Sequence, residues 1–301
     1  MRMRKKQFIS SLLLLLTAAI WGSAFVAQRV GMNYAGPFFF NAARGIIAAI
    51  VLLPVARLFR GKEPTDRRKT LIGGLLCGLA IFAATNLQQA GLIYTAAGKA
   101  GFITTFYIIL VPVLGLFLKK RTGVFTWLAV ALAFCGLYCL CMGPGSFALE
   151  LGDLLLLLCA LFYAVQILLV DRYVPGADCV MLSCIQFAVS GVLSLITALL
   201  VETPDVRVLL QGWAPLLYAG ILSSGVAYTL QIIGQKDLSP TVASLLMSLE
   251  SVFAVLAGWL LLKEQLSGRE LLGCALMFAA VALVQLAPQK AEIKASGSAE
   301  A

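Results

Sequence analysis

The chain contains two copies of one sequence pattern, offset by about 143 residues. At this offset the segment 86–91 falls on 229–234, and Tyr107 falls on Glu250. Each copy holds five apolar segments long enough to cross a bilayer, which takes about 20 residues per helix. An odd number of crossings places the second copy upside down relative to the first. The repeat therefore predicts an all-α integral membrane protein with ten transmembrane helices, arranged as an inverted 5+5 repeat.

Composition supports a membrane protein with little room for a soluble domain. Of the 301 residues, 61% are hydrophobic and 12% are charged, and the mean hydropathy is +0.96; soluble domains are about a quarter charged. The unbroken leucine runs at 12–16 and 154–158 do not alternate as barrel strands do. We expect spans at 9–29, 35–56, 71–90, 99–118, 124–142, 153–171, 179–200, 213–233, 241–262 and 270–287.

The same pattern predicts the domain organisation. A first repeat is expected at 8–142 and a second at 152–287, separated by the turn-rich segment 143–146. The tail at 288–301 is small and polar, with too little apolar content to pack, and we expect it to be disordered in the cytoplasm.

The net charge of +9 comes from basic residues gathered near three predicted span ends, at 2–6, 57–69 and 119–121. Under the positive-inside rule these segments face the cytoplasm. Ten crossings then return the C-terminus to the same side, which predicts a multi-pass protein of the cell membrane with both termini cytoplasmic. A nucleic-acid partner is not expected, because the basic residues form no contiguous binding face; the lipid bilayer is the expected partner.

Cysteine and histidine usage argues against a metal site and against an enzyme. The sequence has eight cysteines, mostly within apolar segments, with no Cys-x-x-Cys pair and no histidine. Zinc sites and serine–histidine nucleophiles need residues that this chain lacks. We therefore predict no cofactor, no metal and no catalytic residues.

Several motifs resemble one family, the EamA-type branch of the drug/metabolite transporter superfamily. They are Trp21 to Phe25, Arg44, the stretch 95–112, its repeat mate 238–254 and the segment 262–264. The resemblance covers roughly residues 8–287 and implies ten helices, two EamA repeats, cytoplasmic termini and transport of small metabolites or drugs through a central cavity. Ser251 stands where the family usually has proline after Leu-Glu, and we expect this to leave the span at 241–262 straighter.

Our functional prediction is a secondary active transporter of small metabolites or drugs, working as an exporter by alternating access, with protons as the candidate coupling ion. The alternatives left open are a facilitator without ion coupling and a non-transporting membrane sensor or partner protein. Either a monomer or a homodimer fits the sequence.

Two ionisable residues, Arg44 and Glu250, lie deep inside predicted spans. Such placement is rare because a charge at the helix centre costs about 2.5–3.5 kcal/mol on insertion scales. In one interpretation Arg44 holds an anionic group of a substrate and Glu250 binds a proton or a cationic group. In the other, the two residues form a structural ion pair. Burial favours the neutral form of a carboxyl group, which suits Glu250 to proton transfer.

Uncharged polar and aromatic residues in the spans complete the predicted substrate site. Amide side chains are hard to place against lipid, so a cavity or an interhelical hydrogen bond is expected for each. Tyr107 is the repeat mate of Glu250, and Gln186 is the approximate mate of Arg44, so the cavity should be chemically asymmetric. The further predicted residues are Trp21, Asn86, Gln88, Gln89, Tyr107, Tyr163, Gln166, Gln186, Tyr228 and Gln231.

Overall fold

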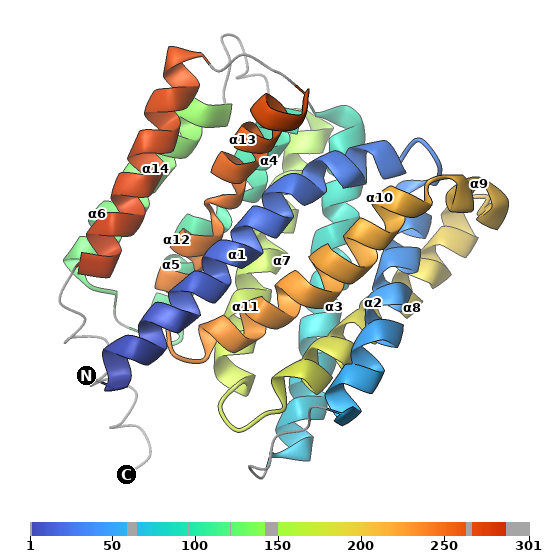
Figure 1. Ribbon diagram of the computed structural model, residues 1–301, viewed down its shortest axis with the longest axis horizontal. Helices are drawn as coiled ribbons and strands as arrows, with labels where there is room; N and C mark the ends of the chain where they lie inside the picture. The colour runs from blue at the N-terminus through green and yellow to red at the C-terminus, as the bar shows by residue number, and fades with distance from the viewer. Residues whose placement is uncertain are drawn as a thin grey trace.

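A computed structural model describes residues 2–58, 65–95, 97–120, 122–141, 150–262 and 267–286. Every regular element in these ranges is a helix (Figure 1). Nine described helical segments are long and apolar enough to cross a membrane, and Val124–Leu140 is a shorter apolar tenth. The predicted all-α membrane fold with ten spans is thus confirmed. The expected repeat break at 143–146 and the tail at 288–301 lie outside the described residues.

The helices follow the apolar segments, and several of them begin after a polar cap residue. Asp66 caps one of them, since its carboxylate accepts hydrogen bonds from the backbone N–H groups of Arg68 (2.9 Å) and Lys69 (3.1 Å). The first repeat comprises α1 (Arg2–Gly31), α2 (Pro37–Leu58), α3 (Arg67–Tyr94), α4 (Ala97–Thr104), α5 (Tyr107–Phe117) and α6 (Val124–Cys141). The second comprises α7 (Leu151–Tyr173), α8 (Cys179–Val201), α9 (Val206–Gln211), α10 (Trp213–Leu217), the π-helix η1 (Tyr218–Ala227), α11 (Tyr228–Gln235), α12 (Pro240–Met247), α13 (Glu250–Leu262) and α14 (Gly268–Leu286).

Two spans that we expected to be continuous are each broken near the middle. The span at 99–118 divides into α4 and α5 at Thr105, and the span at 241–262 divides into α12 and α13 at Ser248. At each break a hydroxyl bonds to a preceding carbonyl: Thr105 Oγ1 to Gly101 O (2.8 Å) and Ser248 Oγ to Leu245 O (2.8 Å), a contact that bends helices. The break lies at Ser248–Leu249, before Ser251, so the expectation that the missing proline leaves this span straighter than in the family stays a prediction.

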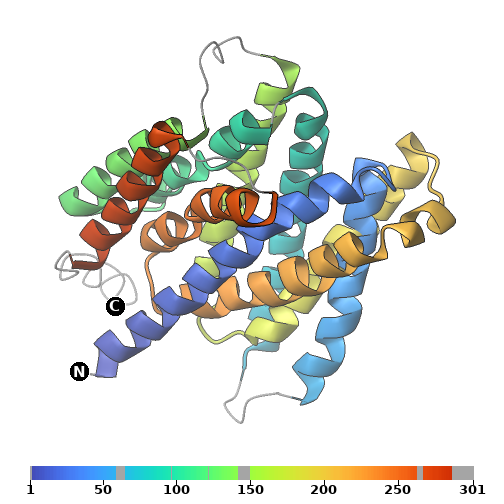
Figure 2. The same cartoon turned by 45° about the horizontal axis from the view of Figure 1, so that its top comes forward.

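Contacts between the repeats show their opposite directions. At the face where α1 begins, here called the N-terminal face, Ser10 Oγ lies 3.4 Å from Asp237 Oδ2, just after α11. At the opposite or far face, Thr95 Oγ1 at the end of α3 lies 3.4 Å from Asp153 Oδ1 in the first turn of α7. The first helix of one repeat leaves the N-terminal face, whereas the first helix of the other runs toward it (Figure 2). This is the inverted arrangement predicted from the repeat.

Glycines let the helix backbones approach closely. Gly45 of α2 faces Gly191 of α8, and a Cβ built on Gly191 would lie 2.9 Å from the Ile46 backbone nitrogen. Similarly, a Cβ on Gly136 of α6 would lie 3.0 Å from the Gly273 carbonyl oxygen of α14. Small residues of this kind support helix association in a bilayer, where burial of apolar surface gives no driving force.

We expect Gly191→Ala to destabilise the protein by about 1–2 kcal/mol, because the added methyl group forces backbone atoms of α2 and α8 apart. Gly101→Ala is the matched control, since a Cβ there meets nothing within 4 Å. Heating detergent-solubilised protein and following the monodisperse fraction by size-exclusion chromatography would measure both. Equal stabilities of the two variants would contradict the close approach of α2 and α8.

Candidate functional site

A cavity lies between the two repeats, at the level of the broken helices. The space among its lining residues, including the part that is open, is about 510 Å³. Thr104 and Tyr107 flank the first break, Met247 and Glu250 flank the second, and all four residues line the cavity. Discontinuous helices beside a cavity between inverted repeats are typical of the substrate sites of secondary transporters.

Nine of the twelve residues predicted for the site line this cavity. Arg44 and Glu250 are both among them, so the two deep charges share one space. The nine are Trp21, Arg44, Gln88, Tyr107, Tyr163, Gln166, Tyr228, Gln231 and Glu250.

Arg44 is a buried cation that faces the cavity and has no hydrogen-bonded partner among the described residues. Arg44 is 4% exposed. Within the described ranges its guanidinium makes neither a hydrogen bond nor an ion pair. Tyr163 and Tyr228 are its electrostatic neighbours. No ion pair joins Arg44 to Glu250 in the described part of the chain, so the structure gives no support to the structural ion pair left open by the sequence. A buried charge without a partner is costly, which makes Arg44 the chief feature that the fold itself does not explain.

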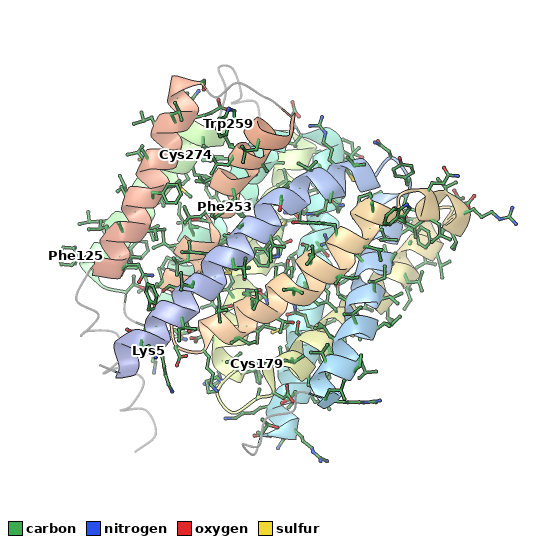
Figure 3. The ribbon with its side chains drawn as sticks, viewed as in Figure 1. Lys5, Phe125, Cys179, Phe253, Trp259 and Cys274 are labelled. Atoms are coloured by element: carbon green, nitrogen blue, oxygen red, sulfur yellow. The ribbon has the colours of Figure 1, made fainter. Side chains whose placement is uncertain are left out.

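Glu250 is the first residue of α13 and is 7% exposed. Its Oε1 accepts a hydrogen bond from the Tyr107 hydroxyl at 3.1 Å, and Tyr107 is the first residue of α5. The repeat mates therefore meet across the cavity, each at the start of a half-helix. The amino end of a helix stabilises negative charge, which favours a carboxylate at this position. Farther along α13, Phe253 lies against α1 at Gly22 (Figure 3).

Aromatic rings form much of the cavity wall. The rings of Trp21 and Tyr228 lie 4.5 Å apart, and those of Tyr107 and Tyr163 lie 6.4 Å apart. The Trp21 indole N–H donates to the Ser223 carbonyl at 3.3 Å, which joins α1 to the π-helix. These contacts fix rings from both repeats around the two charged groups, and so offer an apolar surface to a bound molecule.

A chain of buried glutamines leads from the cavity toward the N-terminal face. Gln231 Nε2 donates to Gln166 Oε1 (3.0 Å) and to Gln235 Oε1 (3.0 Å), and Gln235 Nε2 donates to the Ile167 carbonyl (3.2 Å). Gln166 Nε2 donates in turn to Gln186 Oε1 (3.1 Å). The chain joins α7, α8 and α11 of the second repeat.

Three predicted residues, Asn86, Gln89 and Gln186, do not line the cavity. The Asn86 amide donates to Ser194 Oγ (2.7 Å) and accepts from Asn41 Nδ2 (3.1 Å), and so bonds α3 to α8 and α2. Gln89 is fully buried, and neither of its amide atoms has a partner among the described residues. Gln186 lies behind Gln166. Sequence alone marks all of these as polar residues in spans and cannot separate a cavity wall from an interhelical bond.

Six lining residues were missed by sequence reasoning. Gln28 follows Trp21 by seven residues, or about two helical turns, so the shared helix face could have indicated it. Ser223 lies in the π-helix, whose widened turn leaves no signal in hydropathy. The six are Phe25, Gln28, Thr104, Ile167, Ser223 and Met247.

Comparison with known proteins agrees with this architecture. The chain matches the EamA-like transporter family twice, at residues 8–142 and 150–286. A protein of Archaeoglobus fulgidus called an uncharacterized transporter is 32% identical over 291 residues, covering 93% of this chain and 87% of that protein. A protein of Escherichia coli K12 called the uncharacterized inner membrane transporter YedA is 26% identical over 274 residues, covering 89% of this chain and 87% of YedA.

A solved crystal structure shares the fold with a TM-score of 0.78 and 18% sequence identity, covering 92% of this chain and 96% of that one. The two matches to the family cover the two halves of the sequence repeat. Two repeats of five helices agree with the nine long apolar helices and the shorter tenth found in the described residues. This multi-pass membrane protein therefore belongs to the EamA-like transporter family.

Proposed function

We propose that the protein is a secondary transporter that carries a small organic solute with an anionic group, and that the cavity between the repeats is its binding site. The guanidinium of Arg44, unpaired within the described structure, carries this proposal. A buried cation that faces a cavity is stabilised by an anionic group that enters it, and arginine suits carboxylate and phosphate groups because its donors form a planar fork. The aromatic wall formed by Trp21 and Tyr228 favours a solute that also has an apolar part.

Glu250 is the candidate for coupling to protons. It faces the same cavity from the other repeat, and its partner Tyr107 is a neutral donor rather than a cation. A carboxyl group without a counter-ion can exist in either protonation state, and intramembrane carboxylates serve as proton relays in transporters. Export is the proposed direction. A facilitator lacks only the coupling step and would need no carboxylate here.

Transport assays test the proposal. Purified protein in proteoliposomes should take up or release members of a labelled panel of metabolites, and the transported members should share an anionic group. Uphill movement is expected only when a proton gradient is imposed. Arg44→Gln protein serves as the control, because it is expected to keep the fold and to lose the proposed anion site. A panel in which only cationic or uncharged solutes move would contradict the role given to Arg44.

We further propose that the N-terminal face is cytoplasmic, from the basic residues at the ends of the spans. Two exposed, uncharged residues beyond opposite ends of α8, Pro175 and Thr203, test this orientation. Pro175 precedes Gly176, whose carbonyl accepts from the Asp66 N–H (2.8 Å) at the N-terminal face. Thr203 follows Glu202, whose carboxylate accepts from the Phe38 N–H (2.9 Å) at the far face.

In a cysteine-free background, we expect Thr203→Cys to react with a membrane-impermeant maleimide in intact cells, and Pro175→Cys to react only after the cells are opened. The neutral replacements leave the basic residues in place, so they do not disturb the signal under test. The reverse pattern would show that the termini face outward, and labelling of both variants in intact cells would contradict the predicted crossing between them.

A further inference from the structure

We propose that the ion pair between Lys120 and Asp171 is a gate that closes the cavity toward the N-terminal face and separates in each transport cycle. The inference rests on the proposed function, because a gate of this kind is needed only if the two repeats move apart to release a solute. It assigns a role to two residues outside the cavity lining.

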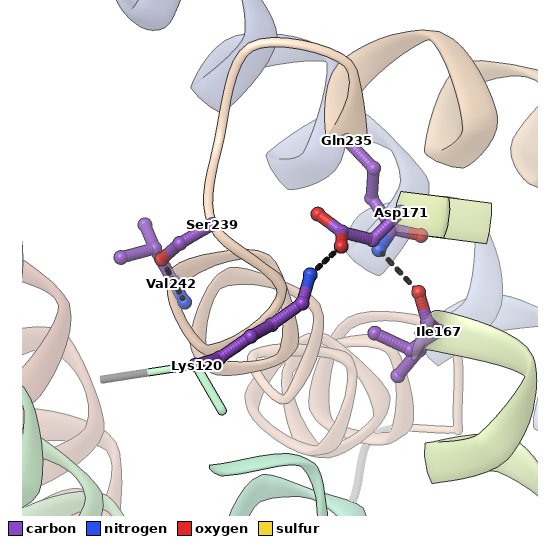
Figure 4. A network of polar contacts seen from close by, with 6 residues as sticks. All are labelled: Lys120, Ile167, Asp171, Gln235, Ser239 and Val242. Carbon is purple, nitrogen blue, oxygen red and sulfur yellow. Dashed lines mark hydrogen bonds and ion pairs between the residues drawn. The ribbon is translucent and has the colours of Figure 1, made fainter. Parts of the chain in front are cut away.

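The pair joins the two repeats across the N-terminal face. Lys120 lies in the turn between α5 and α6 of the first repeat, and Asp171 lies in the last turn of α7 of the second repeat. The Lys120 ammonium donates to Asp171 Oδ2 (Figure 4). It is the one ion pair found in the ranges that the structure describes. Because separation of the repeats at this face would pull α5 away from α7, the pair must break whenever the cavity opens there.

The turn that carries Lys120 has a defined shape. Lys119 adopts a left-handed backbone conformation with φ of 59°. The Lys120 N–H then bonds to the Gly115 carbonyl (2.9 Å) and the Lys119 N–H to the Leu116 carbonyl (2.9 Å). This is the Schellman arrangement, which ends a helix and reverses the chain. The turn holds the Lys120 backbone close to the end of α5, and so presents its side chain to α7.

The gate and the cavity are one helical turn apart on α7. Ile167 lines the cavity, and Asp171 follows it by four residues. The Ile167 carbonyl also accepts from Gln235 Nε2, as Figure 4 shows, and Gln235 in turn bonds to the cavity residue Gln231. The ion pair therefore lies between the cavity and the N-terminal face. If a bound solute shifts Gln231, the hydrogen bonds through Gln235 would pass that shift to Ile167 of α7, one helical turn before Asp171.

The strength of the pair suits a contact that opens repeatedly. The side chains of Lys120 and Asp171 are 38% and 18% exposed, so water reaches both. Arg172 is close enough to interact unfavourably with Lys120. Partly exposed ion pairs contribute little to stability, and a weak contact can separate without a large barrier. A fully buried pair at this place would hold the two repeats together.

Accessibility of Ile167 reports on the gate without any transported solute. In a background with all eight native cysteines replaced, Ile167→Cys is reconstituted in vesicles of known orientation. A membrane-impermeant methanethiosulfonate reagent is then applied at the N-terminal face. We expect Asp171→Asn to raise the rate of modification about fivefold, because loss of a partly exposed ion pair shifts the population toward the open form. Lys120→Gln should have the same effect.

Two further variants make the test specific. The exchanged pair Lys120→Asp with Asp171→Lys should return the rate to that of the parent. Lys119→Asn removes a neighbouring charge while keeping a residue that tolerates the left-handed conformation, and should leave the rate unchanged. Unchanged rates in both neutralised variants, failure of the exchanged pair to restore the rate, or an equal increase in Lys119→Asn would each overturn the gate.

The accessibility experiment and the transport assay can each fail while the other succeeds. If the rates change as expected while no solute in the panel is transported, the result supports opening of the cavity at this face and counts against the proposed anionic solutes. If transport is found while the modification rates do not respond, the transport proposal stands and the cavity is closed toward this face by other contacts.

Discussion

Arg44→Gln is expected to weaken binding of the transported solute by about 100-fold and, at the same time, to stabilise the empty protein by about 2 kcal/mol. Both effects follow from the same observation, a buried guanidinium with no partner in the described structure. Its charge is unfavourable while the cavity is empty and favourable once an anionic group enters. A structural ion pair predicts the opposite for stability, because removal of one partner would leave a buried charge behind.

Arg44→Lys is the matched control. It keeps the positive charge but loses the planar fork that binds two oxygens of one anionic group, so affinity should fall by an intermediate amount. Thermal denaturation of purified, solute-free protein measures the stability effect, and saturation binding with an anionic solute identified in the panel measures affinity. A destabilised Arg44→Gln protein that Glu250→Gln partly rescues would return Arg44 to a structural role.

The fold could be predicted because two strong and independent signals agree. Apolar runs of membrane-spanning length define the helices, since a bilayer leaves the backbone few other ways to satisfy its hydrogen bonds. The internal repeat with five spans per copy then determines the inversion. Charge at the span ends gives an orientation as well, which stays a prediction until it is measured.

The two central charges could also be found from the sequence, for a simple physical reason. Ionisable side chains within spans are so costly that the few present point to a special role. The sequence could not show whether the two charged side chains contact each other. Whether Arg44 and Glu250 pair or stand apart depends on side-chain directions on α2 and α13. These follow from helix packing, of α2 against α8 at Gly45 and of α13 against α1 at Gly22.

The helix breaks escaped prediction because no glycine or proline marks them. Thr105 and Ser248 are ordinary residues in helices, and each makes a local hydroxyl-to-carbonyl bond. Thr17 and Thr85 make the same kind of bond within α1 and α3, which are not broken, so the residue type alone does not mark a break. Polar residues such as Asn86 posed the converse difficulty. An amide in a span satisfies its hydrogen bonds equally well toward another helix or toward a cavity, so the residue type alone does not choose.

Glu250→Gln is expected to abolish uphill transport driven by a pH gradient while leaving solute exchange largely intact. The glutamine amide resembles a protonated carboxyl group in size and polarity but cannot release a proton. It can still accept the hydrogen bond from Tyr107 through its carbonyl oxygen, so the contact between α5 and α13 should persist. Solute that binds at Arg44 would then cross in both directions without energy from the proton gradient.

Glu202→Gln is a suitable control for the loss of a carboxylate. Glu202 accepts hydrogen bonds from the backbone N–H groups of Phe38 and Phe39 (both 2.9 Å) at the start of α2, away from the cavity lining. This variant should keep pH-driven accumulation, even if its stability falls. Proteoliposomes loaded at one pH and diluted into another measure uphill uptake, and preloaded vesicles without a gradient measure exchange. Full pH-driven accumulation by Glu250→Gln would show that Glu250 does not couple protons to transport, whereas loss of exchange together with accumulation would place the residue in solute binding instead.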